Sequence, residues 1–239
     1  MRLLVSVRSG EEVATALAGG ADIIDAKEPA RGSLGAVTEA ALATIAACTP
    51  PSVPLSVALG DCSDLDDLRS ALAVARTGER SAPVYLKLGF ARAHSRGRIT
   101  ALLEAAIGSA NGARVVAVGY ADFGVAASAP PEDVLRAAAA ARAGGFLVDT
   151  CLKDGRALLD HLSIERLTAL SLNARAAGLL FAVAGSLDAD SIARLAGIAD
   201  VLGVRGAACR GGRDGAVDQE RVARLRRCVD QRRMLTPVE

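Results

Sequence analysis

The sequence predicts a single-domain α/β protein built on a parallel β-sheet. The chain has 239 residues, 51% of them hydrophobic, which is enough to bury a large core. Eight short apolar segments recur along it, separated by alanine- and leucine-rich segments with helical spacing. Near-continuous apolar strands that alternate with amphipathic helices are typical of a parallel sheet whose faces are covered by helices.

The eight apolar segments are predicted strands because each is short, continuous and mostly β-branched or aliphatic. In chain order they are residues 3–7, 22–26, 55–59, 84–88, 115–119, 146–149, 179–184 and 201–204. The clearest helical stretches between them are residues 11–20, 39–48, 131–145 and 164–178. Three similar segments fit a helix end followed by the next strand, namely AGGAD at 18–22, AGG at 143–145 and AGIAD at 196–200.

Eight strand–helix units in a chain of this length indicate a (β/α)8 TIM barrel, in which residues 1–239 form one domain. A doubly wound open sheet is the alternative, although that fold does not require eight strands. No linker, low-complexity segment or change in composition indicates a second domain. We expect a loose C-terminal tail from about residue 228.

Composition and charge argue against several classes of function. A net charge of +1 and an aromatic content of 3% argue against nucleic-acid binding. The five cysteines are widely separated and the two histidines are isolated, so no disulfide framework and no metal site are expected. The N-terminal segment turns polar after about five apolar residues, too soon for a signal peptide or membrane span. We therefore expect a cytoplasmic protein without a membrane partner.

Lysine is rare in this chain. Of its 28 lysine and arginine residues, only Lys27, Lys87 and Lys153 are lysines. Each lies at or just after the end of a predicted strand, as do Asp25 and Asp149, and in a TIM barrel these ends surround the active site. For any one lysine, a solvated rim residue or a salt-bridge partner is the simpler interpretation. All three placements together favour a functional cluster.

Clustered lysines have a chemical use that arginine cannot serve. Each protonated amine lowers the pKa of its neighbour. A neutral lysine can form a Schiff base with a carbonyl compound while another amine or a carboxylate moves protons, whereas arginine stays protonated. Asp25 lies two residues before Lys27 and so shares its face of the strand. We expect Asp25 to hold Lys27 or relay protons, with a structural ion pair as the alternative.

Small residues follow the predicted seventh and eighth strands, where TIM barrels often bind phosphate through backbone amides. The candidate phosphate ligands are the amides of Gly185, Ser186, Gly206 and Ala207 and the charge of Arg205 or Arg210. Glycines also simply end strands, so this cluster alone does not identify a phosphate site. Beside the lysines, it points to a phosphorylated carbonyl compound as substrate.

Several long motifs resemble those of the (5-formylfuran-3-yl)methyl phosphate synthase family of methanofuran biosynthesis. They are LLVSVRSGEEVATALAGGADIIDAKEPARGSLGA, KLG, VAVGYAD, VDTCLKDG, AGSL and GVRGAACRGG, and the resemblance extends from residue 1 to about residue 227. It implies a TIM barrel that joins two glyceraldehyde 3-phosphate molecules through a lysine Schiff base, with loss of phosphate and water. No metal or cofactor is implied.

The resemblance also implies roles for individual residues. Lys27 matches the Schiff-base lysine, Lys87 the proton-accepting lysine, and Asp149 and Lys153 a further catalytic pair. Cys151 departs from its motif, where a small apolar residue is expected, and packing is favoured over a reactive thiol. The high alanine and arginine content favours a bacterial member of the family.

Three other functions stay open at this point. The chain could be a class I aldolase or dehydratase acting on another phosphorylated carbonyl compound. It could instead be a non-catalytic sensor of a phosphorylated ligand, or an assembly subunit that keeps only the barrel. A homo-oligomer is compatible with the sequence.

Overall fold

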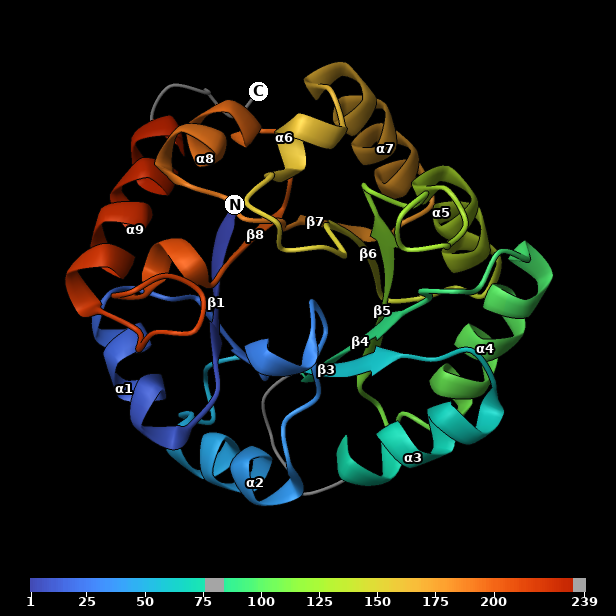
Figure 1. Ribbon diagram of the computed structural model, residues 1–239, viewed down its shortest axis with the longest axis horizontal. Coiled ribbons are helices and arrows are strands. Elements are labelled where there is room, and N and C mark those ends of the chain that lie inside the picture. The colour runs from blue at the N-terminus through green and yellow to red at the C-terminus, as the bar shows by residue number, and fades with distance from the viewer. Residues whose placement is uncertain (76–83, 234–239) are drawn as a thin grey trace.

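The computed structural model describes residues 1–75 and 84–233, and its strands close into a barrel (Figure 1). The eight strands are parallel and follow one another around the barrel in chain order. Their bounds are β1 Arg2–Val7, β2 Ile23–Ala26, β3 Leu55–Asp61, β4 Val84–Gly89, β5 Arg114–Tyr120, β6 Gly145–Asp149, β7 Leu180–Val183 and β8 Val201–Val204. Strand β1 pairs with both β2 and β8, which excludes an open sheet. The TIM-barrel prediction is confirmed, and all eight predicted strands are present.

Helices form the outer ring around the strands (Figure 1). Their bounds are α1 Gly10–Ala18, α2 Glu39–Cys48, α3 Leu65–Ala75, α4 Arg96–Gly108, α5 Pro131–Ala140, α6 Leu158–His161, α7 Ile164–Ala176, α8 Ala189–Leu195 and α9 Gln219–Arg233. Two short 3₁₀ helices, η1 Pro29–Arg31 and η2 Gly206–Ala208, lie in the loops after β2 and β8. The four predicted helical stretches correspond to α1, α2, α5 and α7.

Alternation along the strands separates the outer core from the lumen. On β6, Phe146 and Val148 are fully buried in the apolar cluster between the sheet and the helices. The ring centroids of Phe146 and Phe181 lie 6.1 Å apart in this cluster. Leu147 belongs to the inner cluster, and Asp149 also lines the lumen. Because successive side chains of a strand point to opposite faces, β6 buries one set against the helices and directs the other set, which ends in Asp149, into the lumen.

The C-terminal helix α9 extends to Arg233 and packs against the barrel, beyond the point where the sequence predicted a loose tail. Val222, Leu225 and Val229 are spaced at helical intervals along α9, and all three are buried. The predicted loose tail from about residue 228 is therefore wrong for residues 228–233, and residues 234–239 lie outside the described part. Within the described chain, no helix has both the length and the apolar character needed to cross a bilayer.

Candidate active site at the mouth of the barrel

The lumen and mouth of the barrel enclose a cavity of about 350 Å³. Lys27, Lys87, Lys153, Asp25 and Asp149 all line it, so the structure brings the predicted cluster together. The cluster is withdrawn from solvent, because Lys27 and Lys87 are only 6% and 5% exposed and Asp25 is fully buried. Their catalytic roles stay predictions at this stage.

Asp25 on β2 forms an ion pair with Lys87 on β4, across the lumen. The Lys87 Nζ lies 2.7 Å from Oδ1 and donates a 2.8 Å hydrogen bond to Oδ2, which also accepts from the Ser6 hydroxyl at 2.7 Å. Burial raises the pKa of the Asp25 carboxyl, but the charges of Lys87 and Lys27 outweigh it and bring that pKa below its usual value. Asp25 therefore holds Lys87 directly and acts on Lys27 only through its charge.

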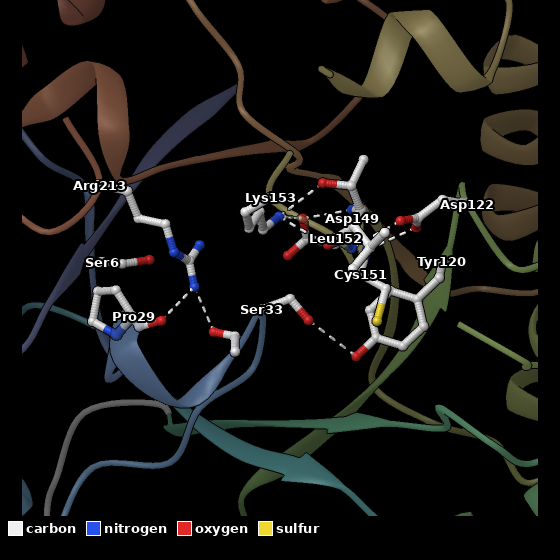
Figure 2. A network of polar contacts seen from close by, with 12 residues as sticks. Ser6, Pro29, Ser33, Tyr120, Asp122, Asp149, Cys151, Leu152, Lys153 and Arg213 are labelled. Carbon is white, nitrogen blue, oxygen red and sulfur yellow. Dashed lines mark hydrogen bonds and ion pairs between the residues drawn. The ribbon is translucent and has the colours of Figure 1, made fainter. Parts of the chain in front are cut away.

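Lys153 is held by the end of β6 and the loop that follows it (Figure 2). Its Nζ donates to Asp149 Oδ1 at 2.9 Å and to the carbonyl and hydroxyl oxygens of Thr150, each at 2.8 Å. These three bonds use all the hydrogens of the ammonium group. Burial raises the pKa of the Asp149 carboxyl, and the charges of Lys153 and Lys27 lower it further than burial raises it.

Asp122, just after β5, shapes the loop that carries Lys153. Its two carboxylate oxygens accept hydrogen bonds from the backbone amides of Cys151 and Leu152, at 2.7 and 2.8 Å (Figure 2). Burial raises the pKa of the Cys151 thiol to about 11, so this thiol stays protonated near neutral pH, as expected of a packing residue. Asp122 was not among the predicted site residues, although its place at a strand end was a signal.

Lys27 differs from the other two lysines because its amine is free. No hydrogen bond joins its side chain to the described part of the protein, although the residue lines the cavity. Burial lowers the pKa of the Lys27 amine to about 8, with Asp149 opposing this shift and Lys87 adding to it. An appreciable fraction of this amine is neutral near physiological pH, and a neutral lysine amine is a nucleophile.

A second polar group fixes the wall between β3 and β5. Tyr120 donates a 2.8 Å hydrogen bond to Asp61. The Ser33 hydroxyl lies 3.4 Å from the Tyr120 oxygen (Figure 2). Gly89 makes this contact feasible, because a Cβ there would lie 2.4 Å from the Asp61 carboxylate and 2.8 Å from the Tyr120 oxygen. Burial, reinforced by the Asp61 charge, raises the pKa of Tyr120 well above its usual value. Tyr120 therefore stays protonated and donates to Asp61, and its oxygen accepts the hydrogen bond from Ser33 that anchors the loop after β2.

The predicted phosphate-binding loops also border the cavity, which is lined by Gly185, Ser186, Gly206 and Ala207. Within the described chain, the backbone N–H groups of these four residues donate to no protein atom. Gly185 has φ +107°, and a Cβ there would lie 3.1 Å from the Thr150 side chain, so the close turn requires glycine. Open amides beside a lysine cluster can bind an anion, and their role in binding phosphate stays a prediction.

Arg205 does not serve as the predicted source of charge for a phosphate. Its guanidinium forms a buried ion pair with Glu12 of α1 through two nitrogens. The same group donates to the backbone carbonyls of Ser6, Arg213 and Gly215. Together these bonds occupy all five N–H donors of the side chain. Arg205 instead ties the loop after β8 to α1, an ion pair that sequence spacing could not reveal.

Replacing Arg205 with methionine is expected to destabilise the fold by about 3–5 kcal/mol, because Glu12 would be left as a buried charge without its partner. Urea unfolding of the variant would measure this loss. Adding Glu12→Gln to Arg205→Met removes the orphaned charge and should recover part of the stability. Equal stability of Arg205→Met and the unmodified protein would contradict the structural role.

Arg213, in the same loop, also lines the cavity, and unlike Arg205 it keeps N–H donors that no described residue uses. Its Nη2 donates to the carbonyl oxygens of Pro29, at 2.9 Å, and Gly32, in the loop after β2 (Figure 2). The motif GVRGAACRGG ends at residue 212, directly before Arg213. Only the position of Arg213 in the loop after the last strand could have indicated a role in the site.

Comparison with known proteins identifies the family of this barrel. Residues 3–226 match the family model described as 4-HFC-P synthase. The chain belongs to the 4-HFC-P synthase family. It is 34% identical over 236 residues to (5-formylfuran-3-yl)methyl phosphate synthase of Methanothermobacter thermautotrophicus, covering 96% of this chain and 99% of that relative. The same-named protein of Methanocaldococcus jannaschii is 36% identical over 233 residues, covering 95% and 98% of the two chains.

Solved structures support the fold independently. The phosphoribosylanthranilate isomerase of Thermotoga maritima aligns with a TM-score of 0.61, covering 97% of this chain and 99% of that one at 12% identity. The KGPDC protein of Streptococcus mutans aligns with a TM-score of 0.58 at 13% identity, covering 96% and 97% of the two chains. At such low identity the likeness is one of fold alone. The named relatives of this 4-HFC-P synthase family member are archaeal, so its bacterial source stays a prediction.

Proposed function

We propose that this protein condenses two molecules of glyceraldehyde 3-phosphate into (5-formylfuran-3-yl)methyl phosphate, with loss of phosphate and water. Membership of the 4-HFC-P synthase family supports the reaction class. One observation carries the proposal: Lys27 is a buried, unbonded amine with a pKa of about 8, in a cavity bordered by four open backbone amides. The amine can bind an aldehyde carbon while the amides bind the phosphate attached to it.

In the proposed mechanism, Lys27 attacks the aldehyde of one triose phosphate and forms an imine with loss of water. Lys87, held by Asp25, removes the adjacent proton to give an enamine. The enamine expels the phosphate from the neighbouring carbon, and the enol carbon formed in this way attacks the ketone of a second triose phosphate, which the same lysines make from glyceraldehyde 3-phosphate by moving a proton between its first two carbons. Asp149 and Lys153, joined at 2.9 Å, transfer protons while a hydroxyl of the second triose closes the ring and two waters leave. Water then hydrolyses the imine, which releases the formyl group and the Lys27 amine, and the phosphate of the second triose stays on the product.

The decisive experiment is incubation of the purified protein with glyceraldehyde 3-phosphate while the ultraviolet absorbance of a conjugated furan aldehyde is followed. The proposal predicts its appearance together with inorganic phosphate. A covalent adduct without a furan would favour a class I aldolase or dehydratase that acts on another phosphorylated carbonyl compound. Ligand binding with neither adduct nor product would point to a sensor.

Imine formation should depend on pH through Lys27. Only the neutral amine attacks the aldehyde, so the initial rate of trapping by cyanoborohydride should rise roughly tenfold per pH unit below about 8 and level off above it. Quantitative mass spectrometry of the adduct across pH 6–10 measures this rate. A midpoint near the usual lysine value of 10.5 would show that the amine is not perturbed in solution.

In the 4-HFC-P synthase family, the product is a precursor of methanofuran. By that analogy, the furan made here is built into a furan-containing carrier of one-carbon units. A downstream enzyme must then act on either the aldehyde or the phosphate ester, since these are the two functional groups of the product.

A further inference from the structure

Arg213 is a half-buried cation without a carboxylate partner. Within the described residues its side chain forms no salt bridge, and its recorded side-chain hydrogen bonds are those from Nη2 to Pro29 and Gly32. An arginine has five N–H donors, so the three on Nε and Nη1 are left for another acceptor. A partly desolvated guanidinium with free donors at a cavity is suited to binding an oxyanion.

The other arginines of the same loop are already occupied. Arg205 is saturated by Glu12 and three carbonyl oxygens. Arg210 is largely exposed and pairs with Asp218 in a separate surface depression. Arg213 alone in this loop combines a place in the cavity with unused donors. Its backbone also lies against Gly206, because a Cβ on Gly206 would be 3.6 Å from the Arg213 nitrogen. Arg213 and Gly206, which carries one of the open amides, are therefore neighbours that line the same cavity.

The bonds that Arg213 does make lead to Lys27. Pro29 and Gly32 belong to the loop that begins directly after Lys27, and the far side of this loop is anchored near Tyr120 through Ser33. Figure 2 shows the contact from Arg213 to Pro29 and, separately, the contact from Ser33 to Tyr120. Arg213 thus holds the loop after β2, which begins next to the free amine of Lys27, by binding two of its carbonyl oxygens.

We propose that Arg213 binds the phosphate group of the aldehyde substrate while it anchors the loop beside Lys27. This inference rests on the proposed function and adds the missing cation to its phosphate site. One guanidinium then sets the distance between the phosphate end and the aldehyde end of the substrate. The chemistry requires a short phosphorylated aldehyde, because the phosphate and the amine share a single cavity of about 350 Å³.

Inorganic phosphate tests the anion site without any catalysis. Titration calorimetry should show that Arg213→Gln weakens phosphate binding at least about tenfold, because charge-assisted hydrogen bonds are lost. The matched control is Arg210→Gln, which removes the same charge from the same loop and should bind phosphate as the unmodified protein does. Circular dichroism and thermal unfolding check that each variant is folded. Equal phosphate affinity in Arg213→Gln and the control would overturn the proposal.

Reductive trapping at Lys27 separates phosphate binding from loop anchoring. With glyceraldehyde 3-phosphate, Arg213→Gln should raise the half-saturating concentration at least about tenfold. With glyceraldehyde, which lacks the phosphate, the same substitution should change the half-saturating concentration by less than about twofold. Loss of the anchor should lower the maximal rate for both aldehydes by a similar factor. If the half-saturating concentrations of both aldehydes rose equally, Arg213 would be an anchor alone. Failure of the unmodified protein to form any Lys27 adduct would instead contradict the proposed function, whatever the phosphate titration shows.

Discussion

Replacing Lys27 with arginine is expected to abolish both furan formation and trapping of the substrate by borohydride. Arginine keeps the positive charge of the site but stays protonated, so it cannot attack an aldehyde. Of the three lysines, Lys27 is the one whose amine is not tied to a neighbouring side chain, and burial lowers its pKa to about 8. We expect a fall in turnover of at least about 10⁴-fold, which corresponds to about 5.4 kcal/mol of transition-state stabilisation.

Peptide mapping of the trapped, unmodified protein provides the positive control, since the adduct should lie on Lys27. An adduct found only on Lys153 would overturn this assignment of roles while leaving Schiff-base chemistry intact. Lys27→Met is the matched neutral variant and should be equally inactive. Loss of activity in every lysine variant, with no adduct in the unmodified protein, would point to electrostatic phosphate binding by the lysines instead.

Replacing Lys87 is expected to separate proton transfer from imine formation. Lys87→Arg keeps a charge beside Asp25, so the pKa of Lys27 should stay near 8 and trapping should persist. Turnover should fall about 10²–10⁴-fold, because a guanidinium is a poor base at neutral pH. Trapping and furan formation, measured on the same sample, would show this difference.

Lys87→Met adds a second, independent readout. The charge of Lys87 helps to lower the pKa of Lys27, and without it the Asp25 carboxylate would also lack its ion-pair partner. Both changes raise the pKa of Lys27, so the midpoint of the trapping profile should move to a pH above 8. The variant should also be less stable by a few kcal/mol, since a buried carboxylate loses its counter-ion. An unchanged midpoint would show that the two amines do not interact.

The fold was predictable because its signal is local. A run such as VYLKL followed by glycine indicates a buried strand wherever it occurs, and eight such runs leave little choice of architecture. The convergence of Lys27, Lys87 and Lys153 was predictable for the same reason, since strand ends meet at one end of a barrel. The C-terminal helix was underestimated because its apolar positions, such as Val229, are separated by charged residues.

The pairing of side chains was not predictable, because it depends on contacts between distant segments. Asp25 is two residues from Lys27, yet its partner is Lys87, 62 residues away, because the barrel closes across the lumen. The sequence predicted Arg205 as a source of charge for phosphate and did not single out Arg213. Both line the cavity, but the loop conformation pairs Arg205 with Glu12 and leaves N–H donors of Arg213 unused by the described residues. No local pattern encodes that choice.

The confinement of every lysine to the cavity has a consequence for the outer surface of the protein. The chain contains three lysines, and all of them line the barrel cavity, so external positive charge is carried by guanidinium groups. Short sugar aldehydes slowly glycate proteins, chiefly by condensing with primary amines. None of the side chains of this sequence offers such aldehydes a primary amine outside the cavity. An enzyme that handled triose phosphates would thus be shielded from lysine glycation by its own substrate.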